Sequence, residues 1–161
     1  MAENLSSRQY AVNRRRPDDR SESAKAFSEL VVTVFRLEGA LALAGDALAA
    51  PAGQTTARWR VLAAVEESPL SVAQIARAWN LARQSVQRVA DVLERDGLVS
   101  YRDNPTHRRA KLVRLTPKGR SVLRRIQSAQ RMWAEGVGRH LARKDLVRAN
   151  LILDKVYQMV R

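Results

Sequence analysis

Two short helical apolar patterns separated by a three-residue break constrain the fold of this chain more than any other feature. They lie in LSVAQIARAWNLARQSVQRVADVLERDGLV, where Ser71 and Gln74 have the spacing of a capping box. The break at 80–82 is followed by a second helix, expected over 83–96 and ended by Gly97. Two short helices joined by so few residues are typical of a helix-turn-helix. The residues expected to be buried are Val72, Ile75, Ala76, Trp79, Val86, Val89, Ala90 and Leu93.

A basic hairpin is expected directly after this pair of helices. The strand-like segments LVSYRDN and AKLVRLT flank the sequence NPTHRRAK at 104–111. Asn104-Pro105 is enough to reverse the chain, so turning does not explain the cationic side chains that follow. A helix-turn-helix followed at once by a two-stranded hairpin is a winged helix. The predicted fold class is therefore mainly α with a small β-wing: a winged helix-turn-helix with long N- and C-terminal helices.

The polar face of the second helix is typical of a helix that enters the major groove of DNA. Arg and Gln side chains can form bidentate bonds with guanine and adenine, and they lie in the first turns, where base edges are met. Arginines at a wing tip suit the negative potential of the neighbouring minor groove. A solvated helix face and a protein-interaction module are the alternatives. The expected contacts to double-stranded DNA are Arg83, Gln84, Ser85, Gln87 and Arg88 on the helix and Arg108, Arg109 and Lys111 on the wing.

The charge balance also favours an anionic partner. Lys and Arg number 29 against 16 Asp and Glu, which gives a net charge of +13 at pH 7. Segment 117–161 carries 11 of these cations and 3 of the anions, so part of the excess is expected on solvated helix faces. Hydrophobic residues make up 45% of the chain, which argues against disorder throughout.

Chemistry other than binding has little support in the sequence. The absence of cysteine excludes disulfides and thiolate metal sites and is compatible with a reducing cytoplasm. His107 and His140 are the two histidines, and no phosphate-cradling glycine loop or metal-ligand spacing occurs. The apolar stretch LALAGDALAA contains Asp46 and is too short to span a bilayer, and the N-terminus lacks the apolar core of a signal peptide. We expect a cytoplasmic protein with no catalytic residues, metal, cofactor or membrane segment.

Further helices are expected on both sides of the winged helix. Thr55 or Thr56 can cap a helix over 56–67, and Thr116-Pro117 can begin another. Three long amphipathic segments exceed what a small winged helix needs to cover its core, which favours a homodimer over an intramolecular bundle. Their apolar positions are Phe27, Leu30, Val34, Leu37, Leu41, Ala44 and Leu48, before an end near Pro51; Val122, Ile126, Ala129, Trp133 and Val137; and Leu146, Ala149, Leu153, Val156 and Val160. The predicted divisions are a flexible basic arm at 1–22, an N-terminal dimerisation helix at 23–54, the DNA-binding domain at 55–116 and C-terminal dimerisation helices at 117–161.

The segments TTARWRVLAAV and NLARQSVQRVADVLERDGLVSYRDNPTHRRAKLVRLTPKG resemble the MarR family of bacterial winged-helix regulators, and the resemblance covers roughly 27–161. It implies a homodimer that acts on a palindromic operator, usually as a repressor. The family's wing usually carries Asp-x-Arg; here His107 stands at the Asp position, Arg109 at the position of the inserted Arg, and Arg108 would be its phosphate neighbour. Ala82 stands where a capping Ser or Thr is common and cannot cap, which leaves the first amides of that helix to water or to a phosphate.

The resemblance also implies a small aromatic or phenolic effector bound between the dimerisation helices and the winged helix. The candidate side chains for this site are Phe35, Trp59 and Trp133, with Arg60 as an anion partner. Ordinary core packing is the alternative for each aromatic residue. A different class of function also remains open, namely a basic architectural protein that coats DNA without reading sequence, using Arg14, Arg15, Arg16 and the arginine-rich helices.

Overall fold

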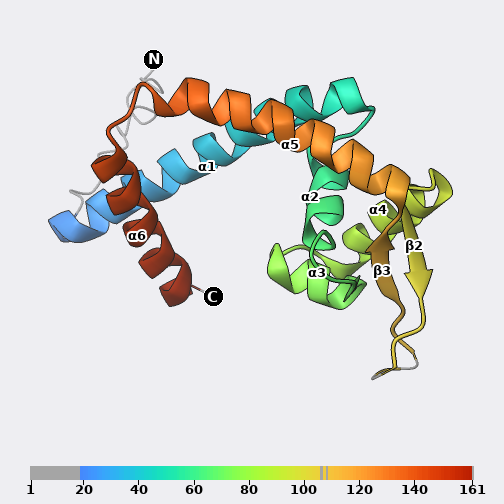
Figure 1. Ribbon diagram of the computed structural model, residues 1–161. Coiled ribbons are helices and arrows are strands. Elements are labelled where there is room, and N and C mark those ends of the chain that lie inside the picture. The colour runs from blue at the N-terminus through green and yellow to red at the C-terminus, as the bar shows by residue number, and fades with distance from the viewer. Residues whose placement is uncertain (1–18, 106, 108, 161) are drawn as a thin grey trace, which may run out of the picture. The chain divides into compact units, whose positions relative to one another are not determined.

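The computed structural model describes residues 19–105, 107 and 109–160 (Figure 1). The residues up to Gly39 and those from Ala40 onwards form two compact units, each considered by itself. The helices are α1 Glu22–Ala49, the 3-10 helix η1 Ala50–Ala52, α2 Thr56–Ala64, α3 Val72–Ala78, α4 Arg83–Arg95, α5 Pro117–Gly138 and α6 Arg143–Val160. The strands are β1 Leu70–Ser71, β2 Val99–Arg102 and β3 Leu112–Leu115. Among these residues, no helix combines the length and the apolar character that crossing a bilayer requires.

The helix-turn-helix forms as the sequence predicts. The Ser71 hydroxyl accepts from the Gln74 backbone N–H (3.3 Å), and the Ser71 N–H donates to the Gln74 side chain (2.8 Å), so the capping box is complete. Asn80 adopts a left-handed conformation (φ 49°) in the turn, and Gly97 does the same after α4 (φ 71°). Glycine adopts that conformation without strain, which explains why the helix ends there.

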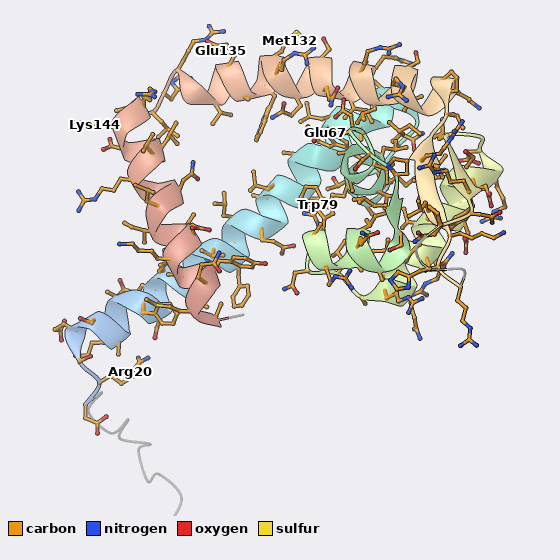
Figure 2. All side chains as sticks on the ribbon, turned by 60° about the horizontal axis from the view of Figure 1, so that its bottom comes forward. Arg20, Glu67, Trp79, Met132, Glu135 and Lys144 are labelled. Carbon is orange, nitrogen blue, oxygen red and sulfur yellow. The ribbon has the colours of Figure 1, made fainter. Side chains whose placement is uncertain are left out.

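One residue expected in the core lies outside it. Trp79 is 43% exposed. The helix α3 ends at Ala78, and the backbone of Trp79 is no longer helical (φ −108°, ψ 7°). Its ring instead lies near Arg60, whose guanidinium carbon is 5.9 Å from the ring centroid. Figure 2 labels Trp79. The prediction that Trp79 is buried was therefore wrong.

The sheet has three antiparallel strands in the order β1-β3-β2. The two predicted hairpin strands pair in the register Val99 with Leu115 and Tyr101 with Val113. β1 was not predicted, because a strand of two residues is too short to show an alternating pattern. Figure 1 shows the β2–β3 hairpin extending beyond the helices as the wing.

A single apolar core joins the sheet to the helices around it. α2 ends at Ala64, earlier than its apolar pattern predicts. α1 begins at Glu22, where the Ser21 hydroxyl accepts from the Ala24 N–H (3.2 Å).

The core residues expected on α3 and α4 are buried, except for Trp79, which is exposed, and Val89, which is partly buried. The buried cluster consists of Val61, Leu62, Val65, Val72, Ile75, Ala76, Val86, Ala90, Leu93, Leu98, Val99, Val113, Leu115 and Leu123.

The start of α5 lies directly against the base of the wing. The Thr116 hydroxyl accepts from the Gly119 N–H (3.0 Å) and donates to the Gly97 carbonyl (2.7 Å), which confirms Thr116 as the cap. A Cβ atom on Gly119 would lie 1.9 Å from the Leu98 carbonyl oxygen. Glycine is therefore required there for the helix to approach the strand so closely.

A second close contact joins the last turns of α1 to the start of α2. The Thr55 side chain caps α2, and the next residue, Thr56, donates its backbone N–H to Asp46 Oδ1 (2.6 Å) and its hydroxyl to the Ala42 carbonyl (3.0 Å). Gly45 is buried at this crossing, where a Cβ would lie 2.5 Å from the Thr56 hydroxyl. The hydrogen bonds from Thr56 lower the pKa of Asp46 below its ordinary value.

Candidate nucleic-acid interface

The first turns of α4 present the side chains expected to contact DNA. Arg83, Gln84, Ser85, Gln87 and Arg88 are all exposed. Val86 and Ala90 of the same helix are buried, so the helix turns its apolar side inward and its polar side outward. No side chain caps the helix at Ala82, as its sequence implies.

The structure brings this helix and the wing to one cleft of about 360 Å³. Arg83 and Gln87 of α4 line the cleft together with Arg109 and Lys111 of the wing. Both wing residues are exposed. Residues more than twenty positions apart in the sequence thus form one cationic surface, which suits the closely spaced phosphates of DNA.

The acidic groups near the end of α4 are engaged within the protein. Asp96 forms an ion pair with Arg58, and its backbone carbonyl accepts from the Lys118 ammonium (2.8 Å). The Glu94 carboxylate accepts from the Tyr101 backbone N–H (3.4 Å). The carboxylates of Glu94 and Asp96 are thus engaged within the protein, while the cations of the first turns of α4 are exposed.

A hydrogen-bonded triangle links α4 to the wing. The Gln87 side-chain nitrogen lies 2.7 Å from Asp91 Oδ1 and 2.8 Å from the Tyr101 hydroxyl, and that hydroxyl lies 2.8 Å from the same Asp91 oxygen. Partial burial, followed by the hydrogen bond to Asp91, raises the pKa of the Tyr101 phenol well above its ordinary value.

Sequence patterns did not identify Asp91 and Tyr101 as neighbours of the site. Tyr101 fits the alternation of a strand, and Asp91 fits the polar face of a helix, so neither is unusual alone. Only the packing of β2 against α4 brings them together. The spacing of Gln87 and Asp91, four residues apart on one helix, was the sequence feature that could have predicted their contact.

The wing residues are partly described. His107 is exposed, its backbone N–H donates to the Asn104 carbonyl (3.2 Å) and its carbonyl accepts from the Ala110 N–H (2.9 Å). The backbone at His107 thus takes part in the turn of the wing. Arg108 lies outside the described residues.

The four candidate effector residues have different surroundings. Trp59 is partly buried against the apolar core, and Arg60 lies near the ring of Trp79. Trp133 on α5 is 37% exposed, and Phe35, which belongs to the other compact unit, is 70% exposed. Trp59 therefore contributes to packing whether or not it also contacts a ligand.

A helix-turn-helix followed by a basic β-wing, with both reading elements at one cationic cleft, defines a winged-helix DNA-binding protein. A model of the MarR family matches residues 52–110. The Mycobacterium tuberculosis protein Rv2011c is 46% identical over 99 residues, which make up 62% of this chain and 69% of the relative. The chain belongs to the MarR family of winged-helix transcription regulators.

Three solved structures illustrate the shared fold. The transcriptional regulator BldR from Sulfolobus solfataricus matches with a TM-score of 0.76 and 20% identity, and the match covers 88% of this chain and 100% of BldR. MosR from M. tuberculosis, solved in complex with DNA, matches with a TM-score of 0.66 and 26% identity, covering 81% and 97%. CouR from Rhodococcus jostii RHA1, solved with p-coumaroyl-CoA, matches with a TM-score of 0.66 and 22% identity, covering 79% and 90%. These similarities confirm the predicted fold class.

Proposed function

We propose that this chain is a cytoplasmic, sequence-specific repressor that binds a palindromic operator as a homodimer and responds to a small ligand. The observation that carries this proposal is the cleft shared by Arg83 and Gln87 of α4 with Arg109 and Lys111 of the wing. A helix in the major groove and a wing arginine in the adjacent minor groove would read base edges and groove shape together.

The apolar surface of the last two helices supports a homodimer. α6 buries none of its residues, and α5 exposes Met132 (70%), which Figure 2 labels on its outer side. An exposed apolar surface of this kind is typical of an interface. A twofold partner would cover it and place two recognition helices about one turn of B-DNA apart, roughly 34–36 Å. The other large exposed apolar residues of α5 and α6 are Trp133, Val137, Leu146, Val147, Leu151, Ile152, Tyr157, Met159 and Val160.

We further propose an aromatic or phenolic effector. The support is the family membership and the p-coumaroyl-CoA bound to CouR. The candidate aromatic residues Phe35 and Trp133 are each exposed within their own compact unit. Arg60 would contribute positive charge to an anionic ligand. Titration of p-coumarate into the complex with operator DNA tests this proposal, because an effector of this class should release DNA while leaving the dimer intact.

The N-terminal arm is proposed to strengthen DNA binding without adding sequence preference. Arg14, Arg15 and Arg16 lie outside the described residues, and their support is charge alone. Deletion of residues 1–22 should weaken binding to all DNA sequences similarly and flatten the salt dependence of the affinity. An unchanged salt slope would rule the arm out.

Selection of bound fragments from the parent genome, followed by footprinting, tests the repressor proposal against the architectural alternative. A regulator should protect a palindromic site and prefer it over random DNA by about a thousandfold or more. Protection that extends evenly along any DNA would favour the architectural protein instead.

A further inference from the structure

The hydrogen-bonded triangle of Gln87, Asp91 and Tyr101 fixes which atom of the Gln87 amide faces the protein. A carboxylate oxygen can only accept hydrogen bonds, so the Gln87 atom 2.7 Å from Asp91 Oδ1 must be the amide nitrogen. The single Tyr101 proton is donated to Asp91 (2.8 Å), so the hydroxyl oxygen also requires a donor from Gln87. Both contacts therefore turn the amide nitrogen towards the protein.

The amide oxygen of Gln87 has no such contact. Within the part of the chain that the structure describes, it forms no hydrogen bond, although Gln87 is exposed and lines the cleft shared with the wing. A bidentate contact with adenine requires a Gln nitrogen and oxygen on the same base edge. The triangle engages the N–H groups of Gln87 with Asp91 and Tyr101, so such a contact would take at least one of them away from these partners. An oxygen alone can accept from an exocyclic amine, either N6 of adenine or N4 of cytosine.

We propose that Asp91 and Tyr101 are positioning residues that make Gln87 an acceptor-only reader of the major groove. Gln87 then selects a base with an exocyclic amine, adenine or cytosine, and discriminates little between the two. This inference rests on the proposed sequence-specific function. Asp91 and Tyr101 need not touch DNA to determine which bases Gln87 accepts.

The partial burial of Asp91 and Tyr101 supports this assignment. Tyr101 is partly buried on β2 and Asp91 is partly buried on α4, so the triangle also joins the wing to the recognition helix. A tyrosine phenol is protonated across the physiological range, so Tyr101 continues to donate to Asp91 there.

Operator selection with the wild type and two variants tests the base preference. The wild type should yield a palindrome with adenine and cytosine both accepted at one position of each half-site. Asp91→Ala removes the acceptor that holds the amide nitrogen, so adenine should gain about tenfold over cytosine there, since a bidentate contact becomes available. Tyr101→Phe keeps the ring and removes one bond, so a smaller shift in the same direction is expected.

The results of the operator selection distinguish a failure of the Gln87 proposal from a failure of the proposed regulator function. A wild type that selects no motif would contradict both. A palindrome with adenine alone at every α4-contacted position, or one unchanged by Asp91→Ala in a folded protein, would overturn the inference and leave the regulator proposal intact.

A measurement without DNA provides a second test. In the free protein, the side-chain amide protons of Gln87 should exchange with solvent more slowly than those of Gln84, an exposed glutamine on the same helix with no hydrogen bond among the described residues. Asp91→Ala should abolish this difference. Equal exchange at the two glutamines in the wild type would show that the triangle does not hold Gln87.

Discussion

At the scale of single residues, one glycine controls how α5 meets the wing. Gly119→Ala would place a Cβ 1.9 Å from the Leu98 carbonyl oxygen, so the helix or strand must move, at a cost of about 1–3 kcal/mol in unfolding free energy. Gly136→Ala on the same helix meets no atom within 4 Å and should stabilise by a few tenths to about 1 kcal/mol. Denaturant melts of both variants check this. A loss at Gly136 equal to that at Gly119 would show that the close contact is not the cause.

At the scale of elements, Asp46 joins α1 to α2 in a pH-dependent way. Its folded pKa is lowered from 3.8, so its stabilising effect is present above that value and is lost as pH falls through the lower folded value. Asp46→Ala should therefore melt at a lower temperature than the wild type at pH 7. The difference should shrink at acidic pH, below about 3.8. Thermal melts from pH 7 to pH 2.5 measure it, and a constant difference would mean that the charge contributes nothing.

The elements also show what could be predicted from the sequence. Ser71 with Gln74, Thr116 and Gly97 act locally, through hydrogen bonds or backbone conformation within a few residues, and each was predicted correctly. β1 was missed because its two residues become a strand only through pairing with β3. Trp79 was misplaced because its apolar spacing extends one residue past the end of α3.

The candidate site was also predicted only in part from the sequence. Exposure of the polar side of α4 follows from helical periodicity, and it was predicted. The contact of Gln87 with Tyr101 depends on how β2 packs against α4, which no local pattern specifies. The part of the site that depends on long-range packing therefore required the structure.

At the scale of the whole molecule, the apolar surface of α6 predicts the oligomeric state. Leu146 is 41% exposed in the protomer, so Leu146→Asp should leave the protomer folded while placing an unpaired charge in the proposed interface. Sedimentation should then show monomers with helical circular dichroism retained. Arg148→Asp, a charge change on an exposed arginine of α6 outside the predicted apolar stripe, is the control and should stay dimeric. Leu146→Asp dimers with wild-type affinity would place the interface elsewhere.

The central claim is that the recognition helix and the wing read one operator in different ways. It is tested by measuring, at fixed salt, the affinities of the wild type, Arg88→Ala and Arg109→Ala for operators with A·T-rich or G·C-rich flanks. Arg88→Ala should lose about 1–3 kcal/mol on both flanks and relax one base pair in each half-site. Arg109→Ala should lose most with A·T-rich flanks and little with G·C-rich flanks, because a wing arginine responds to minor-groove width and potential. An Arg109→Ala variant that binds both operators as tightly as the wild type would contradict the claim.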